Sequence, residues 1–238
     1  MSQLKTAAPR HAASRSPRRR WLRRIAIAVA AVVVLVVLAA WAFVKFGPTA
    51  APLTLPAGPA SAPSGPLDGS WVVGGGSVAG FRVQETALGL SNDAVGRTTA
   101  VTGSVVVSGG RVTSATLRVD LAAITVSGKP QRQFAASLRT GRYPEATFIL
   151  DGPVALPAGF ATGHAITLTV TAQLEMNGVT RQATASISAR RDGRILQVAG
   201  SIPVTFPAWQ INGPGGLGFL GSLADHGTAE FLLILRKA

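Results

Sequence analysis

Acid–base or metal chemistry in this chain would depend on three histidines and ten carboxylates, because cysteine is absent. His164 and His226 are the histidines beyond the N-terminal region, and His226 directly follows Asp225. Neighbouring residues of a strand point to opposite faces, so we do not expect Asp225 and His226 to form an acid/base pair. The chain also lacks a G-x-S-x-G nucleophile elbow and an H-E-x-x-H metal motif. We therefore expect surface or turn roles for both histidines, no catalytic residue and no metal site.

One glycine-rich stretch, residues 213–218, matches the G-x-G-x-x-G pattern of dinucleotide-binding proteins. That chemistry requires the glycines to follow the first strand of a βαβ unit and to open a helix. Here the stretch lies between two late strands. We interpret it as a long flexible loop at the mouth of the domain.

The formal net charge of +13 comes mostly from one end of the chain. Nine of the 23 lysines and arginines precede residue 46, whereas all ten acidic residues lie from Asp68 onward. The remainder carries 14 basic and ten acidic residues, a net +4 that is ordinary for a protein surface. Nucleic-acid binding is therefore not expected.

The basic tail, residues 1–24, precedes a long apolar stretch. Residues 25–44 contain no charge, and twenty residues of helix span about 30 Å, the thickness of a bilayer's hydrocarbon. Trp21 and Trp41 lie near the two ends, as interfacial aromatics do. Five arginines lie within seven residues before the stretch and one lysine follows it closely. We predict a transmembrane helix over 25–46, with the N-terminus cytoplasmic and the C-terminal domain extracytoplasmic.

A cleaved signal peptide is the alternative for this segment, because Ala40-Trp41-Ala42 resembles an A-x-A cleavage site. The apolar stretch is longer than the usual signal-peptide core, which favours a retained anchor. Either reading places the domain outside the cytoplasm. Residues 47–69 are rich in Pro, Ala and Gly without apolar periodicity, and we expect a semi-extended linker there.

Residues 70–238 show the period-two alternation of antiparallel strands, with turn signals at short intervals. Asn177-Gly178 and Asp192-Gly193 predict tight turns, and Asn177-Gly178 is typical of type I′. One short helix is expected within 131–142, where Phe134 and Leu138 are four residues apart. The clearest predicted strands cover 79–84, 101–107, 115–121, 165–176, 180–190, 194–206 and 227–235.

About eight strands in up-and-down order, each with one apolar face, are completed most simply by closure into a barrel, which removes the sheet edges. We therefore predict an all-β antiparallel barrel with one short helix. A two-sheet sandwich is the alternative.

Three segments of this domain are similar to the YceI-like family. They are Ser77 to Val83, Tyr143 to Phe148, and Ala172 to Arg181, which ends in the hairpin sequence Asn-Gly-Val-Thr-Arg. The resemblance covers about Ser70 to Leu235. It implies a lipocalin-like barrel whose elongated apolar interior holds a polyisoprenoid or similar long-tailed lipid in an exported protein. The chain departs from the family pattern in the segment 131–138 and at Pro207 to Gln210.

The candidate ligand contacts are the large inward residues of these strands and the aromatics near one mouth. Each of them could equally be core, because eight-stranded barrels are either filled by side chains or hold one ligand. Small inward residues such as Ala79, Gly103 and Ala115 indicate unfilled volume. The ligand-contact set is Phe81, Val83, Leu117, Phe148, Leu168, Leu174, Phe206, Trp209 and Phe219.

Three functions are compatible with these features. The favoured one is a membrane-tethered lipid-binding module for a polyisoprenoid, quinone or related amphiphile, with no other cofactor. The second is a filled barrel that acts as a structural or protein-interaction module of the cell envelope, and the third and least favoured is an envelope hydrolase. Expected partners are the lipid and, through residues 25–46, the membrane, and a homodimer is left open.

Overall fold

The computed structural model describes residues 29–38, 50–58, 60–87, 90–213 and 221–238. The chain divides into two compact units, Met1–Gly47 and Pro48–Ala238. Within the first unit, residues 29–38 form an apolar, exposed helix. No helix in the described ranges is both long enough and apolar enough to span a bilayer. The remaining parts of the predicted 25–46 span lie outside those ranges, so the span stays a prediction.

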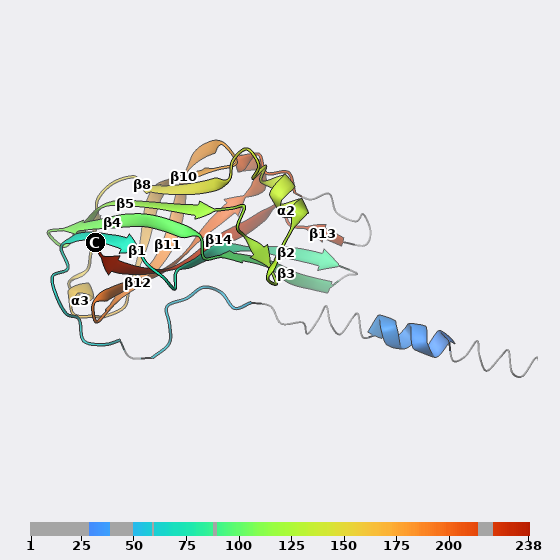
Figure 1. The fold of residues 1–238 in the computed structure, drawn as a ribbon, viewed down its shortest axis with the longest axis horizontal. Helices are drawn as coiled ribbons and strands as arrows, with labels where there is room; N and C mark the ends of the chain where they lie inside the picture. Colours follow the sequence, from blue (N-terminus) through green and yellow to red (C-terminus); the bar gives the residue numbers. More distant parts are fainter. Residues whose placement is uncertain (1–28, 39–49, 59, 88–89, 214–220) are drawn as a thin grey trace, which may run out of the picture. The chain divides into compact units, whose positions relative to one another are not determined.

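The second unit is built on a closed antiparallel barrel (Figure 1). Each neighbouring pair in the ring is antiparallel, and β1 pairs with both β4 and β14, which closes the ring. The closure confirms the predicted barrel and excludes the two-sheet sandwich. In spatial order the eight ring strands are β1 (Gly69–Val73), β4 (Val101–Ser108), β5 (Arg111–Asp120), β8 (Glu145–Leu150), β10 (Ile166–Met176), β11 (Val179–Asp192), β12 (Ile195–Thr205) and β14 (His226–Lys237).

A second hairpin lengthens the barrel at one end. Its strands are β2 (Val78–Ala87) and β3 (Leu90–Thr98). The long strand β14 pairs with β1 near its C-terminal end and with β2 through Thr228 to Leu232. Short strands extend the same sheet: β13 (Gly221–Leu223) pairs with β2, β6 (Thr125–Val126) with β3, β7 (Lys129–Pro130) with β6, and β9 (Val154–Ala155) with β5.

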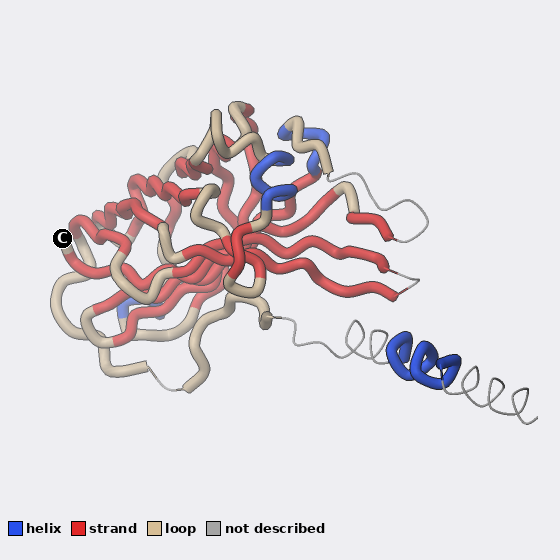
Figure 2. The backbone as a smooth tube through the Cα atoms, turned by 45° about the vertical axis from the view of Figure 1, so that its right-hand side comes forward, coloured by secondary structure: helices blue, strands red, loops and turns tan. Residues whose placement is uncertain are grey.

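Short helices lie at the two ends of the barrel. Helix α2 (Arg132–Ser137) is at the β2–β3 end, and α3 (Ala158–Ala161) is at the opposite end (Figures 1 and 2). The 3₁₀-helix η1 (Phe206–Trp209) follows β12. The helix predicted within 131–142 is shorter than expected because Arg139 adopts a left-handed φ of 50°, which a right-handed helix cannot continue.

The alternation predicted along the strands is realised as an interior and an exterior face. Along β10 the even-numbered residues from Ile166 to Met176 are buried or half-buried, and most of the odd-numbered ones are exposed. At the end of β10, Asn177 and Gly178 have φ values of 56° and 75°. Two consecutive positive φ angles confirm the predicted type I′ turn.

The linker predicted at 47–69 lies, where it is described, against the barrel. We call residues 50–58 and 60–68 the strap. Ser61 and Ser64 form backbone hydrogen bonds with Gly193 at the β11–β12 turn. Arg191, only 5% exposed, donates to the carbonyls of Ser64 and Gly65 at 3.0 and 2.9 Å. The extended conformation agrees with the sequence, but the strap is bound to the domain over much of its length.

An ion-pair network lies under the first residues of the strap. Glu230 of β14 accepts from Arg82 Nε at 2.8 Å and from Arg97 at 2.5 Å, and Arg82 also bonds Asp93 at 2.9 Å. Arg82 donates further to the carbonyl of Ala50 at 2.7 Å. Partial burial alone would lower the pKa of Arg82, but its hydrogen bonds and ion pairs with Glu230 and Asp93 raise that pKa above its ordinary value.

Candidate functional site

The barrel interior contains a cavity of about 420 Å³ at the end that carries α2. Its walls come from β2, β5, β8, β10, β12 and β14, with Phe134 of α2 and Leu138, the residue after that helix. The apolar residues of the lining include Phe81, Val83, Val101, Leu117, Leu121, Ile124, Phe134, Leu138, Phe148, Leu174, Met176, Ile202, Val204, Phe206, Ile211, Phe231 and Leu233.

The polar side chains of this lining lie at its rim, except for Glu230, which is 6% exposed and paired with Arg82 and Arg97. Gln131 and Gln133 are exposed beside α2, Ser137 and Glu85 are half-buried, and Thr228 lies near the start of β14. Because the deeper walls are almost entirely hydrocarbon, the cavity offers an apolar interior with hydrogen-bonding groups at its opening. That distribution suits an amphiphile whose tail is inside and whose polar group is at the rim.

A smaller cavity of about 100 Å³ continues the interior toward the α3 end. It is lined only by apolar residues, among them Leu168, Val170 and Leu196. Phe160 of α3, 3% exposed, contributes to its lining at this end of the barrel. Nothing in this lining could bind a charged or strongly polar group.

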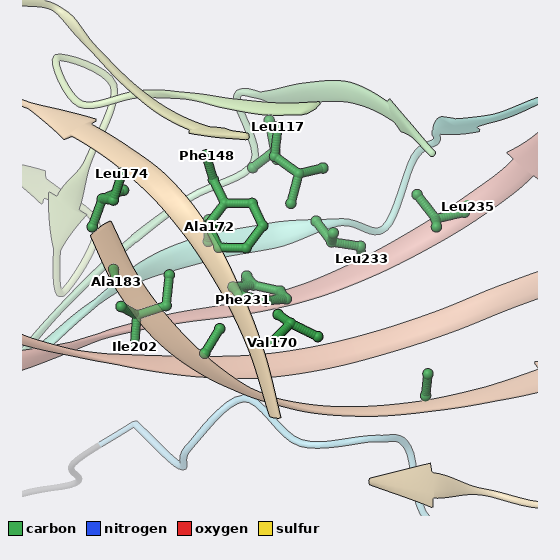
Figure 3. Close-up of a cluster of buried hydrophobic side chains, with 14 of the residues drawn as sticks. Leu117, Phe148, Val170, Ala172, Leu174, Ala183, Ile202, Phe231, Leu233 and Leu235 are labelled. Atoms are coloured by element: carbon green, nitrogen blue, oxygen red, sulfur yellow. The ribbon is translucent and has the colours of Figure 1, made fainter. Parts of the chain in front are cut away.

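Four side chains belong to the linings of both cavities: Leu117, Phe148, Phe231 and Leu233. We call them the waist. Figure 3 shows them between Leu174 and Ile202 on one side and Leu235 on the other. All four are at most 8% exposed. The waist therefore divides the barrel into an outer, larger chamber and an inner, smaller one.

Two phenylalanine rings of the interior lie over glycines of the neighbouring strand. Phe231 of β14 is paired with Gly200 of β12, and Phe81 of β2 with Gly96 of β3. A Cβ added at either glycine would be 2.3 Å from the ring. The missing side chains thus let both rings lie against the barrel wall. Phe81 also stacks on Phe134 of α2, with ring centroids 4.4 Å apart.

The structure brings seven of the nine predicted contact residues to the cavity walls. Leu117 and Phe148 are shared by both chambers, and Leu168 belongs to the inner one. The outer chamber is lined by Phe81, Val83, Leu174 and Phe206. Their placement agrees with the alternation of the strands; their contact with a ligand stays a prediction.

The other two predicted contact residues are Trp209 and Phe219. Trp209 packs in the core, where its indole N–H donates to the carbonyl of Leu174 at 3.2 Å. It is 5% exposed and belongs to neither lining. The reason is that η1 turns its ring under the β10 end instead of toward the lumen. Phe219 lies outside the described residues.

Several lining residues were missing from the predicted set. Phe231 and Leu233 alternate along β14 as clearly as the residues chosen, so the period-two pattern could have found them. Phe134 and Leu138 were noticed only as a helical pair. Their role in the outer chamber depends on where α2 lies across the barrel end, which no local pattern encodes.

His164 and His226 belong to the lining of neither cavity. His226 Nδ1 and Asp225 Oδ1 are 2.8 Å apart, with both side chains largely exposed. This contact corrects the expectation that the two could not pair: Asp225 precedes β14, so strand alternation does not apply to it. The hydrogen bond with His226 lowers the pKa of Asp225. His164 is exposed and bonds Thr162 at 2.9 Å.

Across the described ranges, no group of three or more His, Cys, Asp or Glu side chains could hold a metal ion. The glycine-rich stretch 213–218 lies mostly outside those ranges, and Gly213 lines the outer chamber.

A closed eight-stranded antiparallel ring defines the class of up-and-down β-barrels, whose interiors are filled by side chains or hold one ligand. Within that class, residues 72–231 match the model of the YceI-like domain. The chain belongs to the YceI-like family. Curated protein sequences gave no match to it.

Two solved structures match the chain at low sequence identity, and the first of them shares its fold. A polyisoprenoid-binding domain from Saccharophagus degradans, implicated in plant cell wall breakdown, is 16% identical with a TM-score of 0.54; the match covers 71% of this chain and 98% of that one. BcnA from Burkholderia cenocepacia is 19% identical with a TM-score of 0.47, over 69% of this chain and 95% of that one.

Proposed function

We propose that this protein binds a polyisoprenoid, quinone or similar long-tailed amphiphile inside its barrel. The observation that carries the proposal is the outer chamber of about 420 Å³, with mostly hydrocarbon walls and amide, hydroxyl and carboxylate groups at its rim. That volume is within the range of ligand pockets, roughly 300–1,000 Å³. Each methylene moved from water into such a cavity contributes about 0.8 kcal/mol.

The match to a polyisoprenoid-binding domain supports the choice of ligand class. At 16% identity that likeness concerns the fold. The likeness adds that a barrel of this architecture can hold a polyisoprenoid. The lining of this protein gives an independent physical reason, because a cavity with mostly hydrocarbon walls favours a flexible apolar tail.

The proposal includes a membrane tether. The support is the uncharged stretch 25–44 with its arginine-rich N-terminal flank, which favours a cytoplasmic N-terminus and an extracytoplasmic barrel. An anchored barrel would stay near the bilayer in which its ligand is dissolved. A homodimer remains a prediction.

The competing function, a filled barrel that serves only as an interaction module, predicts side chains that occupy the lumen. The two chambers count against it, and the glycines opposite Phe231 and Phe81 enlarge the lumen further.

The ligand test uses the full chain, purified from membranes and extracted with organic solvent. Mass spectrometry should detect an isoprenoid or quinone in about one-to-one amount with the protein. Val83→Glu, which places a carboxylate in the outer chamber, should remove the lipid, because a buried unpaired charge opposes an apolar tail. Ile149→Glu, at a residue 48% exposed on β8, is the matched control and should retain it. Wild-type protein that neither carries nor takes up such a lipid would refute the proposal.

The tether is tested separately by cell fractionation with tags at both ends. We expect the full-length chain in the membrane fraction, with the C-terminal tag accessible to external protease and the N-terminal tag protected. A mature protein that begins at Phe43 would exclude the retained anchor and leave the extracytoplasmic location intact. Protection of the C-terminal tag would exclude both.

A further inference from the structure

We propose that the inner chamber is a subsite for the far end of the ligand's tail, and that Phe231, held against Gly200, sets the tail length that the barrel accepts. The proposal rests on the proposed lipid-binding function and specifies how that site selects its ligand. A tail that enters at the rim reaches the waist after crossing the outer chamber, and only a longer tail continues beyond it.

The inner chamber has the properties of a subsite for a chain terminus. Its lining is apolar throughout, so it can receive methyl and methylene groups and nothing that needs a hydrogen bond. Phe160 contributes to its lining at the α3 end. The chamber of about 100 Å³ therefore adds a limited length to what the outer chamber holds.

Phe231 is the waist residue whose position the backbone determines most directly. Its ring occupies the space in which Gly200 would carry a side chain, with Cζ 2.3 Å from the position of that missing Cβ. Real side-chain carbons do not approach so closely, so a Cβ at Gly200 must displace the ring. Because strand β12 lies on one side of the ring, the displaced ring moves toward the lumen and narrows the waist.

Two substitutions at the waist should change the accepted tail length in opposite directions. Phe231→Ala removes the ring and joins the two chambers. Gly200→Ala keeps the ring and pushes it into the passage. Leu196→Phe is a third variant that leaves the waist alone and fills the inner chamber, whose lining includes Leu196.

The experiment measures binding of a series of prenyl alcohols, each longer than the last by one isoprene unit, to the full-length protein. Wild-type affinity should rise with each unit until the tail fills both chambers and then stop rising. Phe231→Ala should move this plateau to longer alcohols. Gly200→Ala and Leu196→Phe should move it to shorter ones, with at least about a tenfold loss for each excluded unit, since one buried methylene is worth roughly fourfold in affinity.

Two controls distinguish an effect of the waist on tail length from a general loss of protein stability. The double variant Gly200→Ala/Phe231→Ala should recover the long alcohols that Gly200→Ala loses, because the clash needs both groups. Ile149→Ala, at an exposed position beside Phe148, should leave the plateau unchanged. If all variants keep the wild-type plateau while binding normally, the length proposal is wrong and the lipid-binding function stands. If wild-type protein binds no alcohol of the series, both are wrong.

Discussion

Asn177, in the hairpin segment that resembles the YceI-like family, stabilises the fold. It is fully buried, and its side-chain N–H groups donate to the carbonyls of Trp209 and Gln210 at 3.0 and 2.8 Å, while its side-chain oxygen accepts from Arg139 at 2.7 Å. The next residue, Gly178, lies against the ring of Tyr143, which a Cβ would approach to 2.6 Å. The motif segments around Tyr143 and Asn177 therefore contact each other and fix one end of the barrel.

Replacing Asn177 by Ala should lower the free energy of unfolding by about 3 kcal/mol, because the carbonyls of Trp209 and Gln210 lose their donors and the buried side chain leaves a gap. The left-handed φ of 56° adds strain that Asn tolerates better than Ala. Chemical denaturation measures the change. Asn212→Ala, at an exposed position, is the matched control and should stay within about 0.5 kcal/mol of wild type. Equal stability of the two variants would contradict the structural role.

Glu230 gives a second test at the scale of single residues. Its carboxylate is 7% exposed and neutralises two arginines, so Glu230→Gln should destabilise the protein by about 2–4 kcal/mol. Asp93→Asn removes a carboxylate that is 37% exposed from the same network and should cost no more than about 1 kcal/mol. The urea midpoints of the two variants measure these stability losses. A larger loss for Asp93→Asn than for Glu230→Gln would contradict the prediction.

The strap is the element whose behaviour departs most from its composition. A stretch rich in Pro, Ala and Gly has no apolar face with which to fold by itself. Here it is ordered by hydrogen bonds from barrel side chains to its backbone, including those of Arg82, Arg190 and Arg191. Trp71 adds a bond from its indole N–H to the carbonyl of Leu67 at 2.9 Å.

Deleting the strap should therefore destabilise the barrel. A protein that begins at Gly69 should unfold at least several degrees below one that begins at Pro48, since about 1 kcal/mol per lost hydrogen bond sums over several bonds. Thermal unfolding followed by circular dichroism provides the comparison. Identical midpoints would mean that the strap only lies on the surface and contributes nothing to stability.

At the scale of the whole molecule, a ligand that occupies the lumen should stabilise the native barrel. Binding to the folded state alone contributes about 2.7 kcal/mol at a ligand concentration one hundred times the Kd. A prenyl alcohol should thus raise the unfolding temperature of wild-type protein in proportion to the logarithm of its concentration. Val83→Glu should show no such rise, whereas Ile149→Glu should show the wild-type one; a rise common to both would indicate binding outside the lumen.

Period-two alternation and turn chemistry are local properties of the chain, so the sequence predicted the Asn177-Gly178 turn and the strands β2, β4, β5, β10, β11, β12 and β14. It did not predict the strands β1, β3 and β8. Closure into a barrel was predicted because it removes the sheet edges. The same alternation found seven of the cavity-lining residues, from Phe81 to Phe206. It could not place Trp209, because that residue belongs to the 3₁₀-helix after β12 and its side chain bonds a carbonyl 35 residues away.

The sequence by itself determined which faces are apolar, where the chain turns, and that an uncharged stretch precedes the domain. Only the tertiary structure decided that the lumen is hollow, that the waist divides it, and that the strap lies on the barrel. The physical reason is that volume and contact between distant segments depend on how whole strands are placed. Gly200 leaves room for the ring of Phe231 on another strand, and the sequence around neither residue indicates that the two will pair.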